Sequence, residues 1–131
     1  TSGAADLDEF RKAAVAAGYT AADSTEDLRE SWSVGSLLSR SVSVYESSLR
    51  LDLCEMDSAD SCRRIYGGMT LPITGEVTES NTLSRQIYAV DSPTNFSAKI
   101  CIGQMLLYVF TTQEDKADVL AFLESVGWWS E

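Results

Sequence analysis

Three cysteines are the residues of this chain best suited to covalent chemistry. They stand at Cys54, Cys62 and Cys101, in a sequence of 131 residues that contains no histidine. A nucleophilic cysteine needs a base or a cationic neighbour to form its thiolate, and histidine is the usual base. Cysteine–histidine and serine–histidine–aspartate catalysis are therefore excluded within a single chain, as are histidine-ligated zinc sites.

The cysteine spacing favours a disulfide between Cys54 and Cys62 over the other pairings. Cys54 ends a predicted strand and Cys62 lies one turn into the next helix, so the thiols meet if the strand end contacts the helix. A rival pair is Cys54 with Cys101, because both point away from the apolar faces of their strands and meet if those strands are neighbours. The third alternative is three reduced cysteines that act as small buried apolar residues.

Four carboxylates fall within nine residues, at Asp52, Glu55, Asp57 and Asp60. A calcium site would need such oxygen ligands, but the glycine at the centre of a calcium-binding loop is missing from this spacing. We interpret the four as helix caps and surface acids, and we predict neither a metal nor a cofactor. A carboxylate-dependent hydrolase or transferase would have to rest on Asp52 with Asp57.

The charge balance restricts the partners of the chain. Twenty acidic residues against ten basic ones give a net charge of −10. Such a surface repels the phosphates of nucleic acids and anionic membranes, so we predict that neither is a direct partner. The longest apolar run, at 105–110, is far shorter than the roughly 18 residues of a membrane span.

The elements that position these residues are clearest in the last third of the chain. At 96–102, apolar residues alternate with others, as in a strand with one buried face. Gly103 and Gln104 offer a two-residue turn into 105–110. That second segment is apolar on both faces and is predicted to be a central strand of the sheet.

Three amphipathic helices are expected at 6–17, 58–66 and 113–126, where apolar residues recur at spacings of three and four. Thr112 followed by Asp115 resembles a capping box and indicates the start of the last helix. Beyond its end, we expect Trp128 to fold back on Leu123.

The rest of the chain predicts strands joined by turns and loops. The expected elements are an edge strand at 19–23, a helical turn or irregular segment at 24–32, a hairpin at 38–44 and 49–53, a loop at 70–81 and a strand at 83–90. Strands in hairpins, with helices between the groups, predict an α+β two-layer sandwich with a mostly antiparallel sheet and three helices mainly on one face. We expect a single globular domain at 1–131, with 1–5 a disordered or processed N-terminal segment.

Several segments together resemble a known group of proteins. They are the run from Asp8-Glu9-Phe10 to Gly18-Tyr19, the hairpin followed by Asp57-Ser58-Ala59-Asp60, and the ending from Lys99-Ile100-Cys101-Ile102-Gly103 to Val126-Gly127-Trp128. Over most of its length the chain is similar to small extracytoplasmic lipoprotein domains of Gram-positive bacteria. The resemblance implies an exported domain, at the cell surface or secreted, that reaches the membrane only through an N-terminal lipid anchor and has no established activity.

The functional hypothesis is a non-enzymatic exported domain that binds a protein or a small molecule. Trp129 would anchor such a partner if it is exposed, because exposed aromatic residues concentrate interface energy. The enzyme alternative is the carboxylate-dependent hydrolase or transferase. The other alternative is a homo-oligomerising structural module, such as a homodimer joined at a strand edge or at the Trp129 end.

Overall fold

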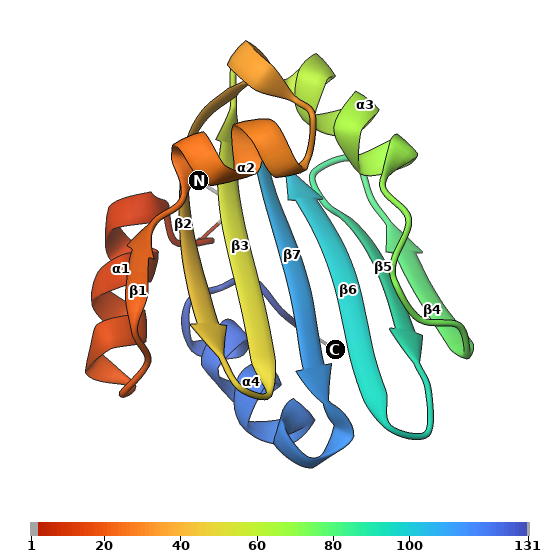
Figure 1. Ribbon diagram of the computed structural model, residues 1–131. Coiled ribbons are helices and arrows are strands. Elements are labelled where there is room, and N and C mark those ends of the chain that lie inside the picture. The colour runs from red at the N-terminus through yellow and green to blue at the C-terminus, as the bar shows by residue number, and fades with distance from the viewer. Residues whose placement is uncertain (1–2, 131) are drawn as a thin grey trace.

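Seven strands form one antiparallel sheet in the order β1-β2-β3-β7-β6-β5-β4 in the computed structural model, which describes residues 3–130 (Figure 1). The strands are β1 (Ala21–Asp23), β2 (Leu38–Glu46), β3 (Leu49–Met56), β4 (Glu76–Asn81), β5 (Gln86–Asp91), β6 (Asn95–Ile102) and β7 (Met105–Thr112). The helices are α1 (Leu7–Ala16), α2 (Thr25–Ser31), α3 (Ala59–Gly68) and α4 (Gln113–Ser125), with a short 3-10 turn, η1 (Gly35–Leu37). The α+β class, the antiparallel sheet and the central position of β7 are thereby confirmed.

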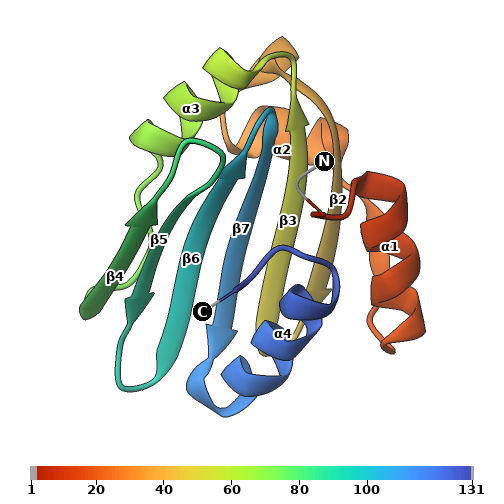
Figure 2. The ribbon, with the colours of Figure 1, turned by 180° about the vertical axis from the view of Figure 1, so that it is seen from behind.

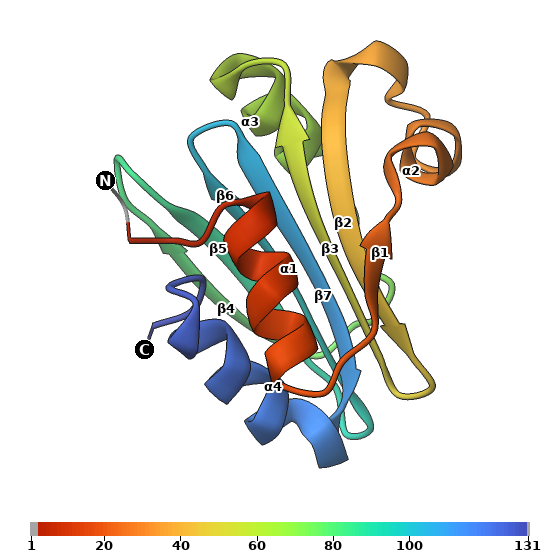
Figure 3. The same ribbon diagram turned by 90° about the vertical axis from the view of Figure 1, so that its left-hand side faces the viewer.

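Helices cover both faces of the sheet. From behind, α1 and α4 lie across one face, which we call the rear face, while α2 and α3 lie at the other, the front face (Figures 2 and 3). The prediction of three helices mainly on one face is wrong in number and in placement. The missed helix is α2, whose buried residues within the helix are Thr25 and Leu28, too few for a helical period to stand out.

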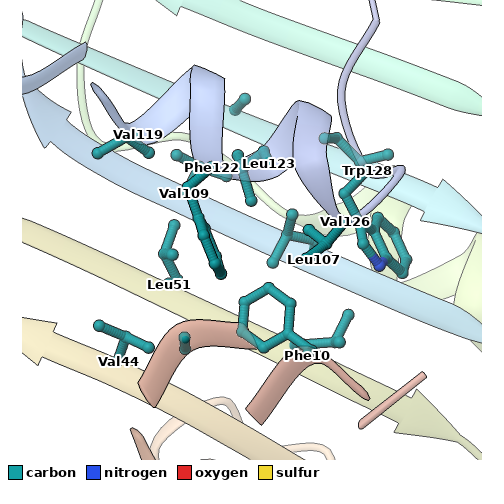
Figure 4. Close-up of a cluster of buried hydrophobic side chains, with 14 of the residues drawn as sticks. Phe10, Val44, Leu51, Leu107, Val109, Val119, Phe122, Leu123, Val126 and Trp128 are labelled. Carbon is teal, nitrogen blue, oxygen red and sulfur yellow. The ribbon is translucent and has the colours of Figure 1, made fainter. Parts of the chain in front are cut away.

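The rear face carries the larger apolar core. Alternate side chains of the strands point to it and meet those of α1 and α4, as Leu107 and Val109 do from β7 (Figure 4). Phe10 of α1 packs edge to face on Phe122 of α4, with ring centroids 5.6 Å apart. The two helices are therefore held to the sheet and to each other by one continuous apolar layer.

The ends of α4 follow the expected capping chemistry. The Thr112 side chain accepts a hydrogen bond from the Asp115 backbone N–H, which confirms the predicted cap. At the other end, Gly127 has φ of +78°, and a Cβ there would lie 2.2 Å from the Gly3 carbonyl oxygen, so only glycine fits. The turn brings the Trp128 backbone N–H to the Leu123 carbonyl at 2.8 Å, as predicted.

The first described residues lie along this C-terminal turn. Ala5 donates its backbone N–H to the Val126 carbonyl at 2.8 Å, and the Trp128 indole Nε1–H donates to the Ala5 carbonyl at 2.9 Å. Trp128 is buried. Of the N-terminal segment predicted at 1–5, residues 1 and 2 lie outside the described residues.

Strand β4 replaces part of the loop predicted at 70–81. All six of its residues are exposed, so no apolar alternation marks it as a strand. It pairs with β5, which begins at Gln86 rather than at Leu83. Among residues 3–130, no helix is long and apolar enough to cross a membrane.

Candidate functional site

The front face is organised in rows that cross the sheet, because side chains paired across antiparallel strands lie next to one another. One row is polar throughout. From β2 to β4 it reads Ser43, Asp52, Tyr108, Lys99, Tyr88 and Glu79. The next row toward α3 is built around Leu106, which pairs with Cys54 on one side and Cys101 on the other. The front face therefore carries polar groups beside a small apolar core, in contrast to the rear face.

A pocket of about 470 Å³ opens on the front face, within the size range of small-molecule sites. Its walls come from three parts of the chain: the segment after α2, the end of α3 with the loop that follows, and two strands of the sheet. The lining residues are Trp32, Val34, Arg50, Ile65, Gly68, Met69, Thr70, Pro72 and Tyr108. Most of these present apolar or aromatic surface. Arg50 is the one charged residue among them.

Arg50 is held in place by its neighbours but keeps hydrogen-bonding capacity. Its Nε donates to Asp52 Oδ2 at 2.7 Å, and its guanidinium lies over the rings of Tyr45 and Tyr108, with Cζ 5.0 and 5.8 Å from the centroids. Within residues 3–130, its two terminal NH₂ groups have no hydrogen-bond partner. Such a planar fork suits a carboxylate or another flat anion.

Asp52 holds Arg50 from inside the protein. Its side chain is fully buried, and its second carboxylate oxygen accepts a hydrogen bond from Ser43 Oγ. Ser43 Oγ also lies 2.6 Å from Ser24 Oγ, which in turn lies 2.7 Å from Ser41 Oγ. A buried carboxylate is tolerated here because both of its oxygens are hydrogen-bonded.

Lys99 fixes α3 above the sheet. Its side chain is buried, and Nζ donates to the carbonyls of Tyr66 and Met69 at 2.7 and 2.8 Å, at the C-terminal end of the helix. The ammonium also lies over the rings of Tyr66 and Tyr88, 4.6 and 5.4 Å from the centroids. Burial lowers the pKa of Lys99, and Glu79 opposes that effect. The contacts secure the part of α3 that forms the pocket wall.

The two carboxylates of the enzyme alternative, Asp52 and Asp57, do not lie together at the pocket. Asp52, fully buried, is bonded to Ser43 and Arg50, whereas Asp57 is exposed just past the end of β3. Five residues along a strand separate them by roughly 16 Å, beyond the spacing of paired catalytic carboxylates. The residues that line the pocket include no carboxylate.

The structure gathers all three cysteines in the front core as buried free thiols. Cys62 Sγ lies 3.0 Å from Cys101 Sγ. Strand β7 separates Cys54 from Cys101, which puts their backbones about 10 Å apart, too far for a disulfide. That rival pairing is wrong because the two strands are not neighbours. The predicted pair, Cys54 with Cys62, stays a prediction.

The acidic residues of the segment 52–60 are dispersed. Asp60 forms an exposed ion pair with Arg63, Glu55 is half-buried and Asp57 is exposed. The cap of α3 is Ser58, whose hydroxyl accepts the Ser61 backbone N–H at 3.1 Å. Among the described residues, no three histidine, cysteine, aspartate or glutamate side chains converge to hold a metal ion.

Trp129 lies on the rear side, away from the front pocket. It is half-buried, and its ring packs edge to face on Phe96 with centroids 5.8 Å apart. It also lines a rear groove of about 500 Å³ beside Lys116 and Leu120. A role for Trp129 in partner binding stays a prediction.

Sequence reasoning missed the principal groups of the pocket. The sequence analysis assigned no role to Arg50, interpreted Asp52 as a cap or surface acid, and left Trp32 in the helical turn or irregular segment expected at 24–32. Alternation along β3 puts Arg50, Asp52 and Cys54 on the face opposite the leucines, so the sequence does predict that these three residues share a face of the sheet. The alternation does not predict that a helix and a loop cover this face and form a pocket.

Comparison of the chain with protein-family models, with curated proteins and with solved structures gave no match. The candidate function therefore depends on the geometry of the pocket and on the chemistry of its walls.

Proposed function

We propose that this protein is a non-enzymatic, exported binding domain whose front pocket takes a small ligand with a flat apolar body and a carboxylate. The observation that carries the proposal is the placement of Arg50. Its terminal NH₂ groups have no partner among residues 3–130, and it is the one charged residue among the lining residues of the pocket. The ligand body would pack beside Trp32 and Tyr108, whose rings meet edge to face at 6.2 Å. Its carboxylate would accept hydrogen bonds from Arg50.

The acidic surface of the protein is compatible with an anionic ligand at this site. Charges more than about 8 Å apart are largely screened at physiological salt, so the net charge of −10 acts weakly on a bound carboxylate. A hydrogen bond to a charged group contributes about 1.5–3 kcal/mol. Contact with the guanidinium, which Asp52 already pairs through Nε, therefore outweighs the more distant acids, while those acids slow the approach of the ligand.

The location proposed for this domain is outside the cytoplasm. The support is the resemblance of its sequence segments to extracytoplasmic lipoprotein domains. The measurement is fractionation of cells that express the full-length precursor, followed by protease treatment of intact cells. Loss of the protein under protease supports the proposed location, and full protection counts against it.

The ligand class is tested by comparing two probes of equal shape, biphenyl-4-carboxylate and biphenyl-4-carboxamide, by isothermal titration calorimetry. For a ligand of this size we expect the carboxylate to bind with a Kd of about 0.01–1 mM. It should bind at least about tenfold more tightly than the amide, because the amide lacks the charge-assisted bond to Arg50.

The matched protein variants are Arg50→Lys and Arg40→Lys. Lysine at 50 keeps a cation beside buried Asp52 but removes the flat fork, so the preference for the carboxylate should fall several-fold. Arg40 is exposed on β2, and the same change there should leave the preference intact. Equal binding of the two probes, or no binding of either, would refute the proposed ligand class.

A further inference from the structure

Two thiols from different elements face each other in the front core. Cys62 lies on α3 and Cys101 on β6, 39 residues apart in sequence, with their Sγ atoms 3.0 Å apart. A disulfide bond is about 2.05 Å long, so the sulfurs need to close by about 1 Å. Small side-chain rotations supply a movement of that size.

The backbones that carry these thiols are already fixed relative to each other. Strand β6 is paired on both sides, with β5 and with β7. Lys99, two residues before Cys101 on the same strand face, binds the carbonyls at the end of α3. At the start of α3, Ser58 caps the helix. The short distance between the thiols is therefore set by the fold and does not depend on a flexible segment.

The local electrostatics distinguish the two sulfurs. The contact between the two thiols lowers the pKa of Cys101, and Arg63 acts in the same direction. The same contact, together with burial, raises the pKa of Cys62. Burial also raises the pKa of Cys54 well above its ordinary value. In the folded protein Cys101 is therefore easier to deprotonate than Cys62, and burial makes Cys54 hard to deprotonate.

We propose that Cys62 and Cys101 form a disulfide that joins α3 to the centre of the sheet when the protein meets a small-molecule disulfide, RSSR. One of the two cysteines, as its thiolate, attacks one sulfur of RSSR, forms a mixed disulfide with SR and releases RS⁻. The other cysteine, after losing its proton, attacks the protein sulfur of this mixed disulfide and releases the second RS⁻. Two protein thiols lose two electrons, and RSSR gains them to become two RSH once the released protons are taken up. Because both thiols are buried, the first attack takes place during local opening of α3 or before folding is complete.

The disulfide would hold one wall of the front pocket in place, an effect on binding that rests on the proposed function. The wall residues Ile65, Gly68 and Met69 belong to α3 or follow it directly. A covalent link in the first half of the helix limits its movement away from the sheet, so the oxidised protein keeps the wall in place. Closing a chain segment of this length should raise the melting temperature by about 10 °C.

The pairing is tested by peptide mapping of the whole chain. The reduced protein is exposed to millimolar oxidised glutathione, remaining thiols are alkylated, and the protein is digested without reduction. Trypsin leaves Cys54 and Cys62 together in peptide 51–63 and Cys101 in peptide 100–116. A second cleavage before Asp57 separates Cys54 from Cys62. The expected result is a link between the Cys62 and Cys101 peptides, with Cys54 alkylated.

Other outcomes of this experiment would overturn the proposal. A link between Cys54 and Cys62, or alkylation of all three cysteines after oxidation, would each refute it. The matched variants are Cys54→Ala, which should keep the link and the rise in melting temperature, and Cys62→Ala, which should lose both. The mapping uses no pocket ligand, so its failure would leave the proposed carboxylate site standing, and failure of the ligand titration would leave the disulfide standing.

Discussion

The rear and front faces of the sheet are built from alternate residues of the same strands, yet they differ in what they bury. On β3, Leu51 and Leu53 enter the rear core, whereas Arg50 and Asp52 face the front. The rear face packs apolar side chains against α1 and α4, and none of its buried residues within 3–130 is charged. The front face buries a carboxylate and a lysine, and it leaves a pocket between its helices.

This difference shows where stability and binding reside in the molecule. Burying an apolar side chain contributes about 1.5–3 kcal/mol to the free energy of unfolding, and most of the buried apolar side chains lie in the rear core. Buried polar groups cost free energy unless they are paired, so the front face keeps Asp52 and Lys99 buried only through their hydrogen bonds. Departures from the best packing concentrate at functional sites. We therefore expect the largest losses of stability from changes on the rear face, and we expect changes in ligand binding to come from the front face.

The largest effect is expected on the rear face, for Phe10→Ala. Phe10 is fully buried and packs on Phe122, so removing the ring should lower the free energy of unfolding by about 3–5 kcal/mol. Urea denaturation measures the change. The variant should still bind the carboxylate probe within about twofold of the wild type when it is folded. A tenfold loss of affinity would show that the two faces are not independent.

A smaller effect is expected on the front face, for Asp52→Asn. The substitution keeps the shape of the side chain but weakens its bonds to Arg50 and Ser43, which should lower the free energy of unfolding by about 2 kcal/mol. The matched control is Asp60→Asn, because Asp60 forms an exposed ion pair with Arg63 that should contribute about 0–1 kcal/mol. Equal effects of the two substitutions on urea denaturation would contradict the role given to buried Asp52.

The smallest effect at neutral pH is expected for Tyr66→Phe. The Tyr66 hydroxyl is buried and has no hydrogen-bond partner among the described residues, so its removal should leave the protein as stable or more stable by up to about 1 kcal/mol. A loss of more than about 1 kcal/mol would show that the hydroxyl has a partner that stabilises the fold.

The same substitution should have a larger effect at alkaline pH. Burial raises the pKa of Tyr66 to about 12, whereas a tyrosine in the unfolded chain titrates near pH 10. Below pH 10 both states hold the proton; between pH 10 and 12 the unfolded state loses it first, so stability falls as pH rises. Tyr66→Phe should remove about 2–3 kcal/mol of this loss by pH 12. Urea midpoints that fall equally in the two proteins from pH 9 to 12 would contradict the raised pKa.

Local patterns in the sequence predicted those elements whose signals are strong within a few residues. The Thr112 cap, the apolar strand at β7 and the turn of Trp128 onto Leu123 follow from neighbouring residues and agree with the structure. Strand β4 has no apolar alternation, because both faces of that edge strand are exposed. Its strand conformation comes from pairing with β5, which local patterns do not report.

The candidate site was less predictable because it depends on the order of strands in space. Cys54 and Cys101 were correctly placed on the face opposite the apolar residues, but β7 lies between their strands. The contact of Cys62 with Cys101 and the pocket wall beside Arg50 both depend on where α3 crosses the sheet. Periodicity predicts the face of a strand on which a residue lies. It does not predict which strand pairs with that strand or which helix packs over that face.

The most direct test of the front face as the binding face is mapping of nitrogen-15 NMR chemical shifts during titration with biphenyl-4-carboxylate. The binding proposal predicts that the largest shifts occur at the Trp32 indole and at Gly68, Met69 and Tyr108, with little change at Trp129 on the rear side. Shifts concentrated around Trp129, or none that saturate, would contradict a front-face site that is formed around Arg50.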